Sequence, residues 1–325
     1  MRIHPRPLAA TVALVAAAAL IAGCTIGKEQ DQPAQVAAGS IKKIDGLAGA
    51  KIRVSSKEFD EQLLLGQIAL VALQAAGASP EDKTNITGSS NVRQALTSGA
   101  VDLYWEYTGT AWISYLKQTK PIADPKAQYD AVKTADVANN ITWWAPSPAN
   151  DTYAIAVNQS ALRQYGVKTL SEYAALAKTN PAAASTCIGP EFKSRDDGFP
   201  GLEKAYGFDL PAAQEHLVND AVVYPTVGKG DTCHFGEVAS TDGRVSAQHL
   251  TVLTDDKSFF PIYNPAIMVS TPVAQKYPQL EQLFTPIAAK LDTPTLTELN
   301  KKVSVDGQKA NTVARDWLKS AGFIG

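Results

Sequence analysis

Short strand-like segments alternate with helix-like segments through most of this chain, and this alternation limits the fold more than any other feature. Lys51–Ser56 alternates apolar and polar residues as a strand does, and Asp60–Ala76 carries Leu, Ile and Val at helical spacing before Gly77. Similar pairs recur to about residue 238. Repeated strand–helix units predict parallel-type sheets with helices on their faces. The expected fold class is therefore α/β.

The remaining elements follow from the same patterns. Further strands are expected near Thr84–Thr87, Val101–Tyr107, Ile141–Trp144, Tyr153–Val157, Thr186–Ile188 and Thr232–Val238. Further helices are expected over Asn91–Ser98, Gly109–Lys117, Lys126–Ala138, Ser160–Tyr165, Leu170–Ala177, Pro200–Tyr206 and Pro211–Leu217. The chain shows no internal repeat of 20–50 residues, so these units do not form a solenoid.

Two extended stretches rich in Pro and Asn, near Trp144–Tyr153 and Leu253–Tyr263, are candidate crossings between two lobes. The 325 residues are long enough for two packed cores. We expect lobe I to comprise residues 49–151 plus 257–325, and lobe II residues 152–256. A chain that crosses twice leaves a hinge and a cleft between its lobes, and such clefts favour small ligands.

Composition excludes several kinds of partner. The chain has 30 Lys+Arg against 32 Asp+Glu, a formal net charge of −2, so it lacks the basic footprint of a nucleic-acid binder. Its three cysteines are too few for a disulfide scaffold or a four-ligand zinc site. No metal or cofactor is expected.

The first residues resemble an export signal. Arg2 and Arg6 precede an apolar run that ends in Ile21-Ala-Gly-Cys24, which resembles a bacterial lipobox. A plain signal peptide with a chance cysteine is the alternative. We expect a signal peptide over residues 1–23 and a lipidated Cys24 with a flexible tether over residues 24–48. The protein is then a lipoprotein on the outer face of the bacterial plasma membrane, and the remaining Cys187 and Cys233 form a disulfide or stay as two free thiols.

Catalytic motifs are absent from the sequence. Its four histidines show no metal-binding spacing, and there is no G-x-S-x-G elbow. We therefore do not expect an enzyme. An extracytoplasmic hydrolase on a similar fold remains a remote alternative, which needs a nucleophile and a base within hydrogen-bond reach.

Aromatic residues gather at two places. Five lie between positions 104 and 115, and Phe259, Phe260 and Tyr263 lie beside the second crossing. Aromatic residues at strand ends commonly fill the core. Tyr107, at the carboxyl end of its strand, is as well placed to face the cleft.

Six segments, in order along the chain, resemble the glycine betaine/choline/carnitine-binding proteins of ABC importers: Ser56–Gln62, Arg93–Thr110, Asn150–Ala154, Glu191–Gly198, Ser240–Arg244 and Leu253–Tyr263. The resemblance implies a two-lobed periplasmic-binding-protein fold of type II. It also implies a monomer that captures a betaine-like osmoprotectant by lobe closure and delivers it to an ABC permease with its ATPase.

The resemblance implies a site as well. Tyr107, Tyr153 and Tyr263 match tyrosines that box a quaternary ammonium group, for which ring faces are good partners. Lys57, Thr110 and Arg195 match positions that grip the ligand carboxylate. Asp151 and Ala239 are further candidates for the ligand site.

Ala239 departs from the family pattern, because relatives commonly place a fourth tyrosine just before Ser-Thr-Asp. Losing one ring costs about 1–2 kcal/mol of binding energy. Alternatively, the vacated volume admits a bulkier ligand, or Phe199, Phe235 or Tyr224 takes its place. The second functional hypothesis is therefore the same receptor for a larger or non-betaine ligand.

Overall fold

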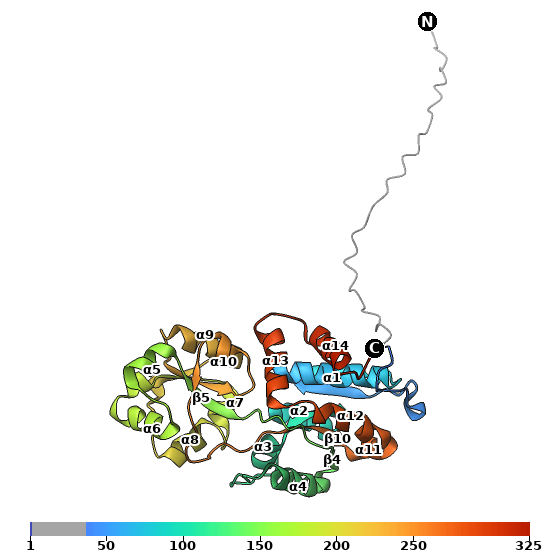
Figure 1. Ribbon diagram of the computed structural model, residues 1–325, viewed down its shortest axis with the longest axis horizontal. Coiled ribbons are helices and arrows are strands. Elements are labelled where there is room, and N and C mark those ends of the chain that lie inside the picture. The colour runs from blue at the N-terminus through green and yellow to red at the C-terminus, as the bar shows by residue number, and fades with distance from the viewer. Residues whose placement is uncertain (2–36) are drawn as a thin grey trace. The chain divides into compact units, whose positions relative to one another are not determined.

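The strands of the computed structural model form two separate five-stranded sheets, each with helices packed around it (Figure 1). The structure describes residue 1 and residues 37–325, and the latter belong to one compact unit. The expected signal peptide beyond Met1, and Cys24, lie outside the described residues. We call the sheet with strand order β2-β1-β3-β10-β4 and its helices lobe I, and the sheet with order β7-β6-β8-β5-β9 and its helices lobe II.

Lobe I takes its strands from two separate parts of the chain. They are β1 Arg53–Lys57, β2 Glu81–Ile86, β3 Leu103–Tyr107, β4 Ile141–Trp143 and β10 Pro265–Ser270. Its helices are α1 Asp60–Ala75, α2 Ser89–Thr97, α3 Thr108–Thr110 (continued by a π-helical turn, Ala111–Tyr115), α4 Pro125–Asp136, α11 Thr271–Lys276, α12 Gln279–Ala289, α13 Thr293–Ser304 and α14 Ala310–Ser320.

Lobe II is built from the intervening residues. Its strands are β5 Tyr153–Val157, β6 Thr186–Ile188, β7 Glu215–Leu217, β8 Phe235–Ala239 and β9 Thr251–Val252. Its helices are α5 Gln159–Tyr165, α6 Leu170–Thr179, α7 Pro190–Ser194, α8 Phe199–Tyr206, α9 Asp220–Lys229 and α10 Arg244–Ala247. The chain passes from β4 to β5 and back from β9 to β10, near the two expected crossings.

Both sheets are mixed, whereas the strand–helix alternation predicts parallel pairing. β1 pairs in parallel with β2 and β3, as expected for strands joined by helices. The two strands that follow a crossing run the other way: β10 is antiparallel to β3, and β5 is antiparallel to β8. A strand that enters from the other lobe is not bound to a helical crossover within its own sheet, so it is free to pair antiparallel. The α/β class itself is confirmed.

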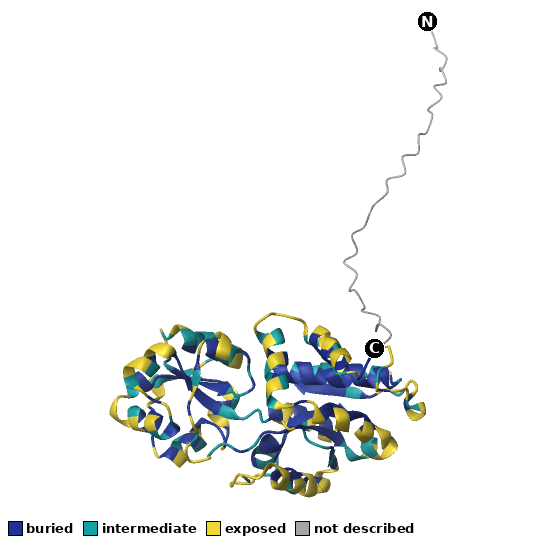
Figure 2. Cartoon of the chain, in the orientation of Figure 1, coloured by how far each residue is buried: buried dark blue, intermediate teal, exposed yellow. Residues whose placement is uncertain are grey.

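Helix α1 forms the centre of the lobe I core. The sequence predicts this helix over Asp60–Ala76, and the structure ends it at Ala75. Leu64, Leu65 and Ile68 are fully buried against the sheet and α14 (Figure 2). Each such side chain stabilises the fold by about 1.5–3 kcal/mol. Because α1 starts three residues after β1, it fixes the residues between them at the carboxyl edge of the sheet.

The predicted helix over Pro211–Leu217 is wrong. Ala212–Gln214 forms one 3-10 turn, and Glu215–Leu217 forms β7, which pairs in parallel with β6. The segment has few apolar residues to set a period, so Ala212, Ala213, Gln214 and Glu215 suggest a helix from propensity alone. Pairing with β6 overrides that propensity.

The end of the expected tether packs on lobe I. In its described part, residues 37–48, the side chains of Ile41 and Leu47 are buried. The backbone N–H groups of Ser40 and Ile41 donate to the carbonyls of Gly322 and Phe323. These residues are therefore part of the folded lobe.

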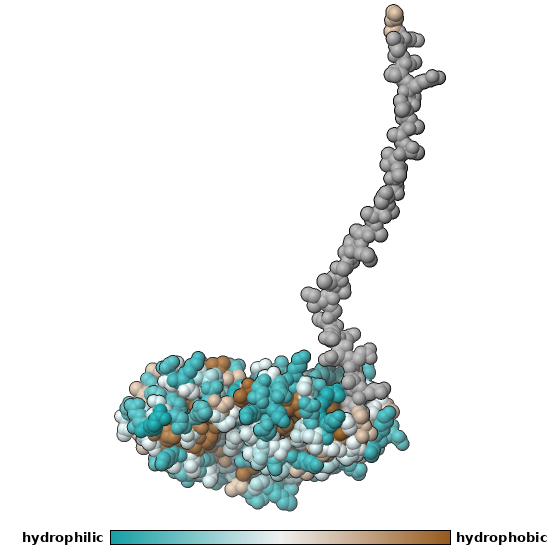
Figure 3. All heavy atoms as spheres, turned by 45° about the horizontal axis from the view of Figure 1, so that its top comes forward, coloured by the Kyte–Doolittle hydropathy of each residue, from teal (hydrophilic) through white to brown (hydrophobic). Residues whose placement is uncertain are grey.

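The visible face of the folded part is mainly hydrophilic, with small and separate apolar areas (Figure 3). Among the described residues, no helix combines the length and the apolar character that crossing a bilayer requires.

Candidate ligand-binding site

A cavity of about 220 Å³ lies between the two lobes and takes its wall from both. Lobe I contributes Lys57, Glu58, Phe59, Asp60, Ser89, Tyr107 and Thr110, and lobe II contributes Tyr153, Glu191, Asn219, Asp220, Ala221, Tyr224, Glu237, Ala239, Asp242 and Arg244. Asp151 and Tyr263 come from the two crossing segments. A cavity shared by two lobes, with aromatic and charged walls, is the first candidate for a ligand site.

Three tyrosines singled out from the sequence meet at this cavity. Tyr107 ends β3, Tyr153 begins β5, and Tyr263 lies just before β10. The rings of Tyr153 and Tyr263 pack edge to face, with centroids 5.6 Å apart. Gly109 permits this arrangement, because a Cβ at that position would lie 2.7 Å from the Tyr263 ring.

Two of the hydroxyl groups are fixed by buried acids. The Tyr107 hydroxyl donates to Oε1 of Glu61 at 2.8 Å, and the Tyr263 hydroxyl donates to Oδ2 of Asp197 at 2.6 Å. Burial raises the pKa of Tyr107, Tyr153 and Tyr263 well above the usual value. The three phenols therefore stay neutral, and their rings are held in place.

Phe59 and Tyr224 are aromatic wall residues as well. Phe59 lies nearly parallel to the Tyr107 ring, with centroids 6.3 Å apart. Tyr224 lies beside Ala239, whose backbone N–H donates to the Tyr224 hydroxyl at 3.1 Å. Of the three aromatic residues expected as substitutes for the missing tyrosine, Tyr224 lines the cavity, whereas Phe199 and Phe235 are core residues.

Lys57 and Thr110, which the sequence analysis expects at the ligand site, both line the cavity. Nζ of Lys57 donates to Oε1 of Glu106 at 2.7 Å, and both side chains are buried. Thr110 follows Tyr107 by three residues and is also buried. A cationic donor and a hydroxyl thus lie close to the Tyr107 side of the cavity.

Arg195, by contrast, is not one of the lining residues. Its Nε and Nη2 donate to Asp197 at 2.7 and 2.5 Å, and Nη1 donates to Glu191 at 2.7 Å. Its Cζ lies 5.4 Å from the centre of the Tyr153 ring. Arg195 therefore lies behind the wall, where it orients an acid and a ring that do reach the cavity.

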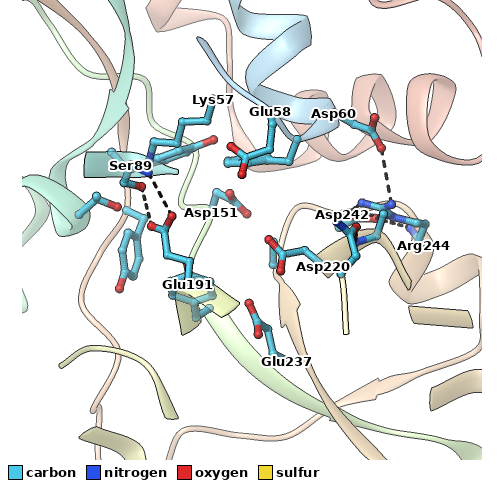
Figure 4. Close-up of a pocket in the computed structure, with 18 of the residues that line it drawn as sticks. Lys57, Glu58, Asp60, Ser89, Asp151, Glu191, Asp220, Glu237, Asp242 and Arg244 are labelled. Carbon is cyan, nitrogen blue, oxygen red and sulfur yellow. Dashed lines mark hydrogen bonds and ion pairs between the residues drawn. The ribbon is translucent and has the colours of Figure 1, made fainter. Parts of the chain in front are cut away.

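Acidic residues outnumber basic residues on the wall of the cavity, which the sequence does not predict. Seven carboxylates line the cavity (Glu58, Asp60, Asp151, Glu191, Asp220, Glu237 and Asp242) against two cations, Lys57 and Arg244. Several of these carboxyl groups point into the same space (Figure 4). Most belong to the motifs that carry the family resemblance, but only the fold brings them together.

These acids differ in their pKa values. Burial alone would raise the pKa of Glu191, but Lys57, Arg195 and hydrogen bonds from Ser89 outweigh it and lower the pKa to about 2. Burial raises the pKa of Asp220 to about 6, and Glu191 contributes to that rise. Burial likewise raises the pKa of Glu237 well above its usual range. The lobe II wall thus combines an ionised acid with acids that hold protons more tightly.

Polar contacts join the lobes around the cavity. Ser89 of α2 donates to Glu191 of α7 through its Oγ at 2.6 Å and its backbone N–H at 3.1 Å. Arg244 of α10 lies 3.6 Å from Asp60 of α1. The cavity is therefore closed in part by direct bonds between the lobes.

The structure joins Cys187 to Cys233 in a disulfide within lobe II, with Cα atoms 5.6 Å apart. Cys187 lies on β6, and Cys233 lies just before β8, which pairs with β6. Among the described residues, no group of three or more His, Cys, Asp or Glu side chains is arranged to hold a metal ion.

Comparison with known proteins identifies the family of the chain. Residues 50–320 match the family described as the substrate binding domain of the ABC-type glycine betaine transport system. The chain is 35% identical over 280 residues to the glycine-betaine-binding protein of Pseudomonas aeruginosa. The matched residues cover 84% of this chain and 89% of that protein.

Two further comparisons refine this picture. The apo structure of YehZ from Escherichia coli is 33% identical and superposes with a TM-score of 0.62 over 85% of this chain and all of that one. The ergothioneine transport permease/ergothioneine binding protein EgtU of Helicobacter pylori is 30% identical over 272 residues, which are 83% of this chain and 47% of that protein. The predicted two-lobed periplasmic-binding-protein fold is confirmed by these matches.

Proposed function

Because the chain belongs to the family of substrate-binding domains of ABC-type glycine betaine transport systems, we propose that it captures a betaine-like quaternary-ammonium solute and delivers it to an ABC permease with its ATPase. The observation that carries this proposal is the convergence of Tyr107, Tyr153 and Tyr263 on one cavity between the lobes. These rings come from lobe I, lobe II and the second crossing, so a ligand that touches all three bridges both lobes.

The rings of Tyr107, Tyr153 and Tyr263, which we call the aromatic cage, suit a quaternary ammonium group. Such a group has no N–H to donate, so its best partners are the electron-rich faces of aromatic rings, each worth about 0.5–2 kcal/mol. Neutral, anchored phenols present those faces without a large entropic cost. The wall also carries seven carboxyl groups against two cations, and those that are ionised, such as Glu191, add a negative potential that favours a cation over a neutral solute.

We propose that Lys57 and Thr110 donate hydrogen bonds to the carboxylate of a betaine. The Lys57 ammonium has three donors and uses one for Glu106, so two remain for a ligand oxygen. Thr110 adds a hydroxyl on the same wall. Arg195 supports this site from behind, since it holds Asp197, which in turn accepts from the Tyr263 hydroxyl.

Capture proceeds by lobe closure. A ligand that contacts both lobes stabilises the closed arrangement relative to the open one, and the permease distinguishes the two. The hydrogen bonds between Ser89 and Glu191 are of the kind that form on closure. We propose further that the protein acts as a monomer, tethered through a lipid on Cys24 to the outer face of the plasma membrane.

A larger betaine that carries N–H groups is the second candidate ligand. Ala239 leaves room where a tyrosine is expected, and Asp220 and Glu237 offer acceptors on the same lobe II wall. The Helicobacter pylori relative is named for ergothioneine, a betaine with an N–H-bearing ring. This candidate keeps the transport role and changes only the solute.

Calorimetric titration tests the proposal and separates the two ligands. The purified chain is titrated in turn with glycine betaine, carnitine, choline and ergothioneine, after thermal unfolding shows that it is folded. We expect saturable one-to-one binding of at least one trimethylammonium compound, and the tightest compound identifies the solute class. No heat from any of the four at two temperatures would contradict the proposed function.

A further inference from the structure

The side-chain hydroxyl of Thr241 contacts two carboxyl groups at once. Its Oγ1 lies 2.6 Å from Oε2 of Glu61 and 2.6 Å from Oδ1 of Asp151. A hydroxyl has one hydrogen to donate, so Thr241 donates in only one of these contacts. The other contact is a hydrogen bond only if the carboxyl group supplies the proton. We call Glu61 and Asp151 the acid pair, and the geometry requires one proton on it.

Glu61 has no cationic partner among its hydrogen bonds. Its Oε1 accepts from the Tyr107 hydroxyl at 2.8 Å, and its Oε2 also accepts from Nδ2 of Asn300 at 2.5 Å. Only 5% of Glu61 is exposed, and burying a carboxylate without a cation is costly. Burial raises the pKa of Glu61 well above its usual range, and Asp151 adds to that rise. Burial also raises the pKa of Asp151, to about 6.

The other charged groups near the acid pair do not neutralise it. Asp242 lies next to Thr241 in the chain, and Asp60 precedes Glu61. The guanidinium of Arg244 donates to Asp242 at 2.5 Å and lies 3.6 Å from Asp60 (Figure 4). Arg244 is therefore shared by these two carboxylates, whose two negative charges exceed its single positive charge, so it leaves no positive charge over for the acid pair. The Tyr107 and Asn300 groups that face Glu61 from β3 and α13 are neutral.

The contact spans the two lobes. Glu61 lies on α1 and Asn300 on α13 in lobe I, Thr241 follows β8 in lobe II, and Asp151 lies in the first crossing. We propose that the acid pair shares one proton through Thr241, and that this shared proton holds lobe II against lobe I. Glu61 is then a positioning residue, because the same carboxyl group anchors the Tyr107 hydroxyl at the cavity.

The proposal has a definite pH consequence. When the lobes separate, the contact between Thr241 and Glu61 is broken, the acid pair no longer shares its proton, and that proton passes to the solvent. The closed form thus holds one proton more than the open form. Raising the pH through the pKa of the acid pair favours the open form, so closure and ligand affinity fall by up to about tenfold per pH unit.

Infrared spectroscopy of the chain tests the shared proton without any ligand. At neutral pH we expect a C=O stretching band of a neutral carboxylic acid that Glu61→Gln and Asp151→Asn each remove to the same extent. The double variant removes no more than either single one. The control Glu172→Gln, which replaces a carboxylate whose pKa is lowered by backbone N–H groups, leaves the band intact. No loss in a single variant, or a doubled loss in the double variant, would overturn the sharing.

The pH profile of ligand affinity tests the positioning role of Glu61. This second experiment rests on the proposed function. With glycine betaine as the probe, we expect affinity to fall with rising pH for the unmodified chain and for Glu172→Gln. In Glu61→Gln the amide donates to Thr241 at every pH, so its affinity falls less steeply with rising pH, and Asp151→Asn serves as the second variant. Equal slopes in all four proteins would overturn the proposal. If glycine betaine does not bind at all, the proposed function fails, and the infrared result alone decides the sharing.

Discussion

Nζ of Lys57 lies 4.9 Å from the centre of the Tyr107 ring, so the protein places its own cation against one ring of the aromatic group. Arg195 stands in a similar relation to Tyr153, with its Cζ 5.4 Å from that ring centre. Among the described cation–ring contacts, none involves Tyr263. The three tyrosines are therefore not equivalent: Tyr263 meets no cation in these contacts and is buried, as Tyr107 is, whereas Tyr153 is half-buried.

Replacing Tyr263 is expected to weaken ligand binding. Tyr263→Leu removes a ring face worth about 0.5–2 kcal/mol and leaves Asp197 without its hydroxyl donor, so affinity falls about tenfold or more. Tyr263→Phe is the matched control, because it keeps the ring and loses only the hydroxyl. Titration calorimetry measures both variants. A Leu variant that binds as tightly as the Phe variant would exclude the ring from the site.

Arg195 is expected to act on stability as well as on binding. Arg195→Met leaves Asp197 and Glu191 without their shared cation, and removing one partner of a buried ion pair costs about 3–5 kcal/mol. Urea denaturation measures the loss. The control Lys126→Met breaks an exposed pair with Asp130, which contributes little to stability because solvent screens it. Equal losses in the two variants would show that Arg195 has no structural role behind the wall.

Ala239→Tyr separates the two candidate ligands. The new ring begins opposite Tyr153 in the β5–β8 ladder and takes up space at the cavity beside Tyr224. We expect it to lower the affinity for ergothioneine at least tenfold and to change the affinity for glycine betaine far less. Parallel titrations of both compounds measure this ratio. If the two affinities fall together, position 239 does not select ligand size.

Glu191 is expected to contribute to acid denaturation. Its pKa is lowered to about 2 in the folded protein from a model-peptide value of about 4.3, so its contribution is complete above that higher value. The contribution is lost as the pH falls through the folded pKa, because the bonds from Ser89 and Arg195 need the ionised form.

The matched variant is Glu191→Gln, which has no charge to lose. Stability measured by urea denaturation from about pH 5 to about pH 2 should fall more steeply for the unmodified chain than for Glu191→Gln. Parallel curves for the two proteins would mean that Glu191 does not gain its low pKa from folding.

Local patterns predict the elements that carry strong periodicity. The α1 helix is predicted to within one residue, because Leu64, Ile68 and Val71 repeat at helical spacing and Gly77 follows. The predicted parallel direction is wrong for β5 and β10, because the direction of these strands depends on where the chain re-enters each sheet after a crossing. β7 is missed because Glu215–Leu217 gains its conformation from pairing with β6 rather than from its own residues.

The site is predicted in part for a related reason. The motifs single out Lys57, Thr110 and the three tyrosines, all of which line the cavity, but a motif does not state what a side chain contacts. Arg195 donates to Asp197, two residues later, and therefore lies behind the wall of the cavity rather than on it. The acidic wall and the Glu61–Thr241–Asp151 contact join residues up to 180 positions apart, so only the folded chain brings them together.

The most direct test of the cage compares glycine betaine with its uncharged-head analogue, 3,3-dimethylbutanoate, in which carbon replaces the nitrogen. The two anionic ends and the two head-group shapes match, so the positive charge of the head group is what distinguishes the two compounds. Titration of the chain with each compound should show at least a tenfold preference for glycine betaine. Equal binding of the two compounds, or tighter binding of the analogue, would contradict recognition of a quaternary ammonium by Tyr107, Tyr153 and Tyr263.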